Sequence, residues 1–195
     1  MQQKISNRTN ERINPNRYVE LDFICWDQVA LLEPIYQENG KNGCRVHYQD
    51  GSYDDVANRC ELVLSRYARY HHTTISFVRE LSEQCPLYKR KRKYSMVFSK
   101  DSCVVPLKCR EARKNESTLC YVVLQKLWHY TPLRNGNTLL LLHNEHKGVE
   151  VLQRIQTVET QFYNARQLMA YCEHHAEELE KLKHQKQGKF IGRYY

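Results

Sequence analysis

The chain has 195 residues, with 30 Lys or Arg against 22 Asp or Glu and a formal net charge of +8. This length suits one domain with a proper hydrophobic core. No apolar run reaches the length of a membrane span and no signal-peptide core opens the chain, so we expect a cytoplasmic protein without a membrane partner.

The first 17 residues are polar and lack periodicity, which predicts a flexible arm. From Tyr18 to Cys25 apolar and polar residues alternate, as in a strand, and Val29 to Leu32 reads as a second strand. The polar pair Asp27-Gln28 between them is a candidate hairpin bend.

Turn signals and a strand follow. Asn39-Gly40 and Asn42-Gly43 are strong turn signals, and Cys44 to Tyr48 reads as a strand closed by Asp50-Gly51. Asp54 and Asp55 then stand where helix caps stand, which predicts a helix from about Asp55 to Tyr70.

One flank of this helix is basic. On a helical wheel Arg59, Arg66 and Tyr70 fall together, with Arg69 further round. The flank is either an ordinary solvated surface or a second surface that contacts phosphates. The next segment, Thr73 to Val78, is β-branched and aromatic and predicts a strand.

The most unusual segment is the run of five basic residues Lys89, Arg90, Lys91, Arg92 and Lys93. Five adjacent positive charges repel one another, so a polyanion nearby explains them better than folding does. Between Leu87 and Arg134 there are twelve Lys or Arg and three acidic residues, a local charge of about +9. Because the whole chain carries +8, the rest is close to neutral, which is typical of a nucleic-acid-binding protein.

More basic residues follow the next hairpin. Tyr94 to Phe98 and Cys103 to Pro106 read as its two strands, and the polar loop from Cys109 to Thr118 comes after them. The basic residues in and beside this loop are Lys108, Arg110, Arg113 and Lys114. Further strands are predicted at 119–124, 138–142 and 149–151.

A long helix is the clearest element. Apolar residues recur at spacings of four and three from about residue 157, with Thr157 as a plausible cap. The stripe consists of Val158, Phe162, Ala165, Met169, Cys172, Ala176 and Leu179. Its second half outruns the sheet, so we expect Cys172, Ala176 and Leu179 to be covered by another copy of the chain.

Together these elements predict an α+β protein made mostly of antiparallel β-hairpins, with one internal helix and a long C-terminal helix. A single domain is expected from residue 18 to residue 180, followed by a basic flexible tail at 181–195.

The chemistry of an enzyme is missing from the pattern. No phosphate loop, dinucleotide-binding glycine pattern or nucleophile elbow occurs, so we expect neither an enzyme nor a cofactor. The eight cysteines include no Cys-x-x-Cys, which favours reduced, half-buried thiols over a zinc site. The histidine pairs lack fitting ligand spacings, so we expect solvent-facing histidines and no metal.

Three segments carry a resemblance to a known family. Val56-Ala57-Asn58-Arg59-Cys60, with Ser65, Tyr67 and Ala68, is similar to a Cys-aromatic-Gly-Ser-x-Tyr-x-Gly-Arg block. The hairpin ending at Val105-Pro106 leads through a polar loop to a strand that opens at Cys120. Val149-Glu150-Val151 precedes Thr157-x-Glu159-x-Gln161-x-Tyr163.

In these segments the chain resembles the competence transcription factor ComK family of Gram-positive bacteria, from about Ala30 to Met169. It departs from the family at the missing glycines, one of which is replaced by Leu64, and near Val122, where a tryptophan is expected.

The resemblance implies a DNA-binding transcriptional activator of late competence genes, located at the nucleoid. It implies recognition of paired AT-rich boxes largely through the minor groove, by a homo-oligomer such as a dimer or a dimer of dimers. RNA polymerase and a proteolytic adaptor are the further partners that it implies. A loop of Lys and Arg suits this mode, because narrow AT tracts concentrate negative potential.

Two other functions stay open. The missing glycines are compatible with a non-enzymatic regulatory interaction protein of the same family that has lost DNA binding and acts through its long helix. An RNA-binding protein is the third, with Tyr88, Tyr94 and Phe98 as candidate stacking platforms.

Overall fold

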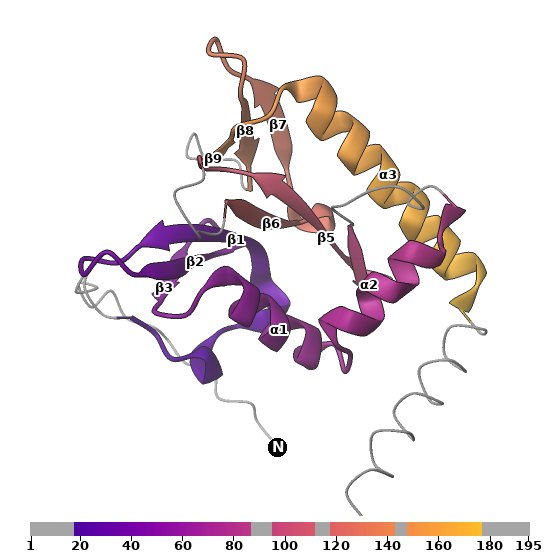
Figure 1. Ribbon diagram of the computed structural model, residues 1–195, viewed down its shortest axis with the longest axis horizontal. Helices are drawn as coiled ribbons and strands as arrows, with labels where there is room; N and C mark the ends of the chain where they lie inside the picture. Colours follow the sequence, from indigo (N-terminus) through magenta and orange to yellow (C-terminus); the bar gives the residue numbers. More distant parts are fainter. Residues whose placement is uncertain (1–17, 87–94, 112–117, 143–147, 177–195) are drawn as a thin grey trace, which may run out of the picture.

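The computed structural model describes residues 18–86, 95–111, 118–142 and 148–176. It confirms the α+β class: mostly antiparallel strands form two sheets, and three α-helices accompany them (Figure 1). The predicted N-terminal arm at 1–17 and the basic tail at 181–195 lie outside the described residues.

The larger sheet consists of two three-stranded β-meanders that are joined through β1 and β6. Its strand order is β3-β2-β1-β6-β5-β4, and every neighbouring pair is antiparallel. The strands are β1 (Val29–Tyr36), β2 (Asn42–Tyr48), β3 (Tyr53–Val56), β4 (Met96–Ser99), β5 (Ser102–Lys108) and β6 (Leu119–Val123).

The remaining elements are a small sheet, three helices and short 3-10 turns. The small sheet has the order β7-β8-β9, with β7 at His129–Pro132, β8 at Thr138–Leu141 and β9 at Gly148–Val151. The helices are α1 (Cys60–Tyr70), α2 (Ile75–Gln84) and α3 (Ile155–His174), and the 3-10 turns lie at Leu21–Phe23, Trp26–Gln28 and Leu124–Lys126.

Both faces of the six-stranded sheet carry buried residues, and each face packs against different elements. One face packs on α1 and α2, for example through Leu32, Val46 and Val104. The other packs on the small sheet and α3 through Leu31, Val105 and Val122. Because side chains alternate along a strand, the runs of apolar residues in β1, β5 and β6 fill two cores at once.

A β-bulge in β1 changes which face of the sheet its side chains point to. The register of β1 against β2 shifts between Val29 and Leu31, and Ala30 and Leu31 both pack in the core on the α3 side. An extra residue in one strand has this effect, since two successive side chains then point to the same face.

The start of the chain differs from the expectation. The segment predicted as a strand from Tyr18 to Cys25 contains the 3-10 turn Leu21–Phe23 instead, and Asp27-Gln28 belongs to the second 3-10 turn rather than to a hairpin bend. Most of its residues are exposed or half-buried and only Ile24 is buried, so the segment lies against the edge of the first core.

The predicted caps of α1 were also wrong. Asp54 and Asp55 lie in β3, where Asp55 accepts hydrogen bonds from Arg45 and Asp54 from the Tyr48 hydroxyl. The helix begins five residues later, at Cys60, with Arg59 at the N-cap position. Tertiary partners on β2 thus outweigh the preference of aspartate for a helix start.

The segment from Thr73 to Val78 is not a strand but the beginning of a second internal helix, α2. Thr74 caps it, since its Oγ1 accepts a hydrogen bond from the Phe77 backbone N–H at 3.2 Å. Val78 and Leu81 repeat at the spacing of a helix and are buried. The cap and this period outweigh the β-branched composition of the segment.

Helix α3 confirms the first half of the predicted apolar stripe. Val158, Phe162 and Ala165 are fully buried, whereas Leu168 takes the central position expected for Met169, which is only half-buried. The helix starts at Ile155 with Arg154 at the N-cap, so Thr157 is not the cap.

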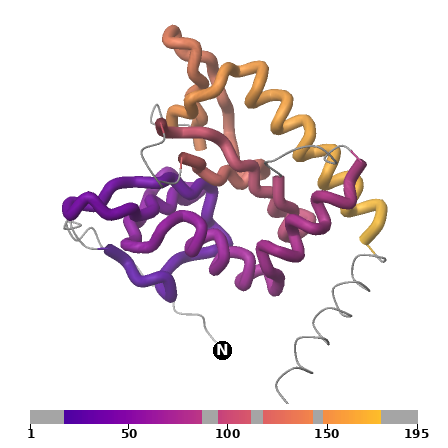
Figure 2. Tube along the Cα trace, in the orientation of Figure 1, coloured from indigo at the N-terminus to yellow at the C-terminus, as the bar shows by residue number. Residues whose placement is uncertain are grey.

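The expectation that another copy of the chain covers the second half of the stripe is wrong for Cys172. Cys172 is covered within the chain by Leu81 of α2 and by Cys85, the residue that follows this helix, and these residues form a third small core with Leu168. Figures 1 and 2 show the later turns of α2 and α3 side by side. Ala176 is exposed, and Leu179 lies outside the described residues.

Candidate nucleic-acid interface

The predicted DNA-binding residues divide into three groups. Lys89, Arg90, Lys91, Arg92 and Lys93, together with Arg113 and Lys114, lie outside the described residues. Arg59, Lys108 and Arg110 lie near the turn between β1 and β2, and Arg66 and Arg69 lie further along α1.

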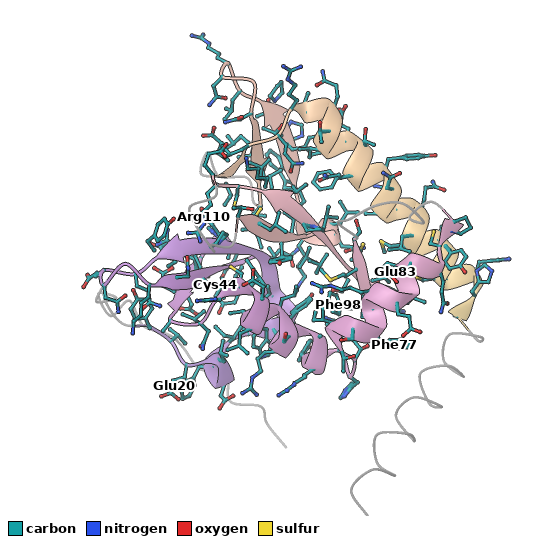
Figure 3. The ribbon with its side chains drawn as sticks, in the orientation of Figure 1. Glu20, Cys44, Phe77, Glu83, Phe98 and Arg110 are labelled. Carbon is teal, nitrogen blue, oxygen red and sulfur yellow. The ribbon has the colours of Figure 1, made fainter. Side chains whose placement is uncertain are left out.

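Arg110 is the best-anchored of these residues. Its Nη2 donates a hydrogen bond to Asn42 Oδ1 at 2.6 Å, and its guanidinium carbon lies 4.4 Å from the centre of the Tyr36 ring. Asn42 and Tyr36 are paired residues at the ends of β2 and β1, and Figure 3 shows Arg110 beside these strands. We call this end of the six-stranded sheet, at residues 37–41, the hairpin end.

Lys108 reaches the hairpin end from the last position of β5. Its Nζ forms an ion pair with Glu111 at 2.8 Å, with side-chain exposures of 34% and 78%. Such an exposed pair contributes little to stability, so a phosphate can replace the carboxylate at small cost.

Arg59 is brought to the same end by a glutamine bridge. Gln37 Nε2 donates to the backbone oxygen of Asn42 at 3.1 Å and to that of Ala57 at 2.7 Å. Arg59 follows two residues after Ala57, and its side chain is exposed. The structure therefore brings Arg59, Lys108 and Arg110 to one end of the sheet.

Gly43 makes this arrangement possible. A Cβ at this position would lie 2.9 Å from the backbone oxygen of Val56, closer than such contacts occur in proteins. The segment Asn42-Gly43, predicted as a turn, is instead the start of β2. Because Gly43 has no side chain, the end of β3 can lie close to β2 at this position.

Arg66 and Arg69 lie towards the opposite end of α1. The helix rises about 1.5 Å per residue, which places Arg69 roughly 15 Å from Arg59. The later turns of α1 are held at the β4–β5 turn, where the Tyr67 hydroxyl contacts Ser102 Oγ at 2.7 Å. The structure thus does not group these two arginines with Arg110, although both are exposed.

One cationic site on the sheet was missed by the sequence interpretation and is already neutralised. Arg45 binds Asp55 through Nε at 2.7 Å and Nη2 at 2.9 Å, and its guanidinium carbon lies 4.2 Å from the centre of the Tyr53 ring. The hydrogen bonds to Asp55 raise the pKa of Arg45. Alternation along adjacent strands is the signal that could have revealed this cross-strand pair.

A similar contact joins His47 and Glu33 on the same face of the sheet. His47 Nε2 lies 2.8 Å from Glu33 Oε2, and His47 stands opposite Tyr53 in the pairing of β2 with β3. Among the described residues on this face, Arg45 and His47 therefore each contact a carboxylate, Asp55 and Glu33 respectively.

The expectation of solvent-facing histidines is wrong at two positions, since His71 and His175 are both half-buried. His71 does not face solvent but is half-buried among Tyr67, Tyr70 and Phe98, with ring centres 4.7, 5.1 and 6.0 Å away. Burial, with Lys126 and His72 nearby, lowers the pKa of His71.

Within the described ranges, no group of three or more His, Cys, Asp or Glu side chains is arranged to hold a metal ion. No helix among the same residues is long and apolar enough to cross a membrane. No family model, no curated protein and no solved structure matches the chain.

Proposed function

We propose that this protein binds double-stranded DNA through its basic middle segment and the hairpin end of its sheet. The observation that carries the proposal is the charge distribution, with about +9 between residues 87 and 134 in a chain of net charge +8. Clustered Lys and Arg release counterions from the DNA backbone, which drives binding without any fixed base contact.

The geometry of the hairpin end supports this proposal. Arg59 and Lys108 stand exposed or half-exposed beside the anchored Arg110. Within the described part of the chain, no ion pair involves Arg59, Arg66 or Arg69. Arg113 and Lys114 follow Glu111 by two and three positions in the sequence.

Helices α1 and α2 raise the question of a helix-turn-helix, since only residues 71–74 separate them. A recognition helix exposes polar and basic side chains to the major groove. The exposed charged residues of α2 are Arg79, Glu80 and Glu83, which together are acidic. The pair therefore does not suit major-groove reading, and this favours recognition of groove shape by Lys and Arg.

The resemblance to the ComK family extends the proposal to a transcriptional activator of competence genes that prefers AT-rich sites and acts at the nucleoid. The alternative, a regulatory protein acting through the long helix, finds less support. The apolar stripe of α3 is buried within the chain as far as Cys172, which leaves less of it for a partner.

Equilibrium binding of the full chain to AT-rich duplex, GC-rich duplex and single-stranded RNA tests this function. We expect the AT-rich duplex to bind most tightly, with an affinity that falls steeply as salt rises. Tighter binding of RNA would assign the basic segment to RNA, and equal affinity for both duplexes would remove the AT preference.

A charge-matched pair of variants tests the location of the site. Changing Lys89, Arg90, Lys91 and Arg92 to Ala should weaken binding and flatten the log–log salt dependence by up to about one unit per lost phosphate contact. The control changes four basic residues outside residues 87–134, Arg79, Arg154, Arg166 and Lys181, to Ala and should have little effect. Equal losses in both variants would show an unspecific charge effect and contradict the proposed site.

A further inference from the structure

One side of α1 combines exposed apolar and exposed basic side chains. Leu62 is 47% exposed and Tyr70 is 45% exposed, and Arg66 and Arg69 stand between them in the sequence and are exposed as well. Residues three, four, seven and eight positions apart share one side of a helix, so these four side chains lie next to one another. The buried residues of α1 pack on the sheet instead. We call Leu62, Arg66, Arg69 and Tyr70 the outer face of α1.

Leu62 makes the outer face a poor match for DNA. Among the described residues it is the one aliphatic side chain in the group of large hydrophobic residues that stay exposed, and the others are aromatic. A phosphate backbone gains little from an aliphatic side chain, whereas protein–protein interfaces combine apolar residues with Arg and Tyr. The composition of the outer face therefore favours a protein partner.

Arg66 and Arg69 carry charges that the fold does not neutralise. Within the residues that the structure describes, no ion pair involves either arginine. The two positions are about one helical turn apart, and two positive charges at this spacing attract a partner that presents carboxylates. A fitting partner thus combines an apolar side chain with acidic residues about one turn apart.

The chain itself contains such a segment, at residues 177–180. It follows Ala176, the last described residue, and consists of Glu177, Glu178, Leu179 and Glu180. Its three glutamates are the only acidic residues in the sequence from 177 to 195. Glu177 and Glu180 are three positions apart, which is also the spacing of the two arginines on the outer face. The segment therefore matches the outer face in charge, in spacing and in its one apolar side chain.

The segment is too short to reach the outer face of α1 in its own chain. Helix α3 packs through Cys172 at the C-terminal end of α2, whereas α1 adjoins the other end of α2 through residues 71–74. Figure 1 shows α3 ending beyond α2, on the side away from α1. The ten residues of α2 span about 15 Å. Glu180, four residues after Ala176, reaches at most about 14 Å from it, so the partner is a second copy of the chain.

We propose that residues 177–180 of one copy dock on the outer face of α1 in a second copy, and that two such contacts form a two-fold dimer. Leu179 of one copy packs against Leu62 and Tyr70 of the other, and the glutamates form ion pairs with the two arginines. Each copy uses both surfaces once, so the assembly closes. The contacts are small, and we expect a dissociation constant of roughly micromolar order. The proposal does not depend on DNA binding.

Charge reversal in the full chain, without DNA, tests this dimer by sedimentation equilibrium. One variant carries Arg66→Glu with Arg69→Glu, and the other carries Glu177→Lys with Glu180→Lys. Each variant should self-associate at least about tenfold more weakly, because like charges then face each other. An equimolar mixture of the two variants should restore the dimer, since each then meets the opposite charge on both contacts.

The matched control is Arg79→Glu with Arg166→Glu, which reverses two exposed arginines on α2 and α3 and should leave the association unchanged. Circular dichroism checks that every variant is folded, and a chain with all four reversals, which should dimerise by itself, replaces the mixture if one variant is not. A wild-type chain that stays monomeric at about 100 μM would overturn the proposal. So would a dimer that survives either reversal, or a mixture of folded variants that stays monomeric.

Discussion

Tyr67 joins α1 to the sheet through a single buried hydroxyl. Its ring is 2% exposed and packs edge-on against Phe98, and its hydroxyl lies 2.7 Å from Ser102 Oγ. Burial raises the pKa of this tyrosine, so the hydroxyl stays protonated at neutral pH. The contact fixes the later turns of the helix over the β4–β5 turn.

Changing Tyr67 to Phe keeps the ring but removes the partner of the buried Ser102 hydroxyl. We expect the free energy of unfolding to fall by about 1–3 kcal/mol, the usual cost of an unsatisfied buried polar group. Denaturant titration measures it, and Tyr70→Phe is the matched control, since Tyr70 is 45% exposed. Equal stability of the two variants would show that the Tyr67 contact contributes nothing.

His71 makes stability depend on pH. Its lowered pKa means that the unfolded chain binds a proton more readily than the folded chain does. Its contribution is therefore complete above the unfolded value near 6.5 and is lost as the pH falls below it. The aromatic rings around His71 are the physical cause, because they exclude the water that would solvate an imidazolium.

Replacing His71 by Phe should thus reduce the loss of stability between about pH 7.5 and pH 5.5. Unfolding free energies at both pH values measure the effect. His72→Asn serves as control because His72 has φ of 53°, a backbone conformation that asparagine tolerates. An unchanged pH dependence in His71→Phe would mean that His71 is protonated equally well in the folded state.

At the scale of elements, α3 provides the clearest test of the second core. Phe162 is fully buried and meets the Tyr130 ring edge-on at 5.3 Å, whereas its neighbour Tyr163 is 59% exposed. Phe162→Ala should reduce the free energy of unfolding by about 3–5 kcal/mol through lost burial and a cavity. Tyr163→Ala, measured by the same denaturant titration, should cost far less. Similar losses would show that α3 does not pack as described.

Long elements with a repeated apolar period were easier to predict from the sequence than short ones. Helix α3 was predictable because its apolar period repeats over several turns, although period alone could not choose between Leu168 and Met169. The short α2 was mistaken for a strand because its β-branched start outweighed the cap at Thr74. Asp54 and Asp55 were wrongly predicted as helix caps for another reason. Their partners, Tyr48 and Arg45, are known only once β2 and β3 are paired.

At the scale of the whole molecule, the grouping of basic residues follows from the joining of the two meanders. Arg59 and Arg110 are 51 positions apart in the sequence, and the β1–β6 pairing brings them to one end of the sheet. Charge counting predicted that the middle of the chain is basic. It could not predict which exposed arginines lie beside Arg110, because that depends on strand order.

The described structure therefore predicts unequal roles for two pairs of basic residues. Arg59→Ala with Lys108→Ala, and Arg66→Ala with Arg69→Ala, remove the same charge. Arg59 makes no side-chain cap and Lys108 only an exposed ion pair, so neither double variant should alter stability appreciably. If DNA lies across the hairpin end, the first pair should lower affinity and flatten the salt dependence by up to about two units of slope, and the second pair by clearly less. Binding isotherms at several salt concentrations give both quantities. A larger loss from Arg66 and Arg69 would move the DNA to the opposite end of α1, away from Arg110.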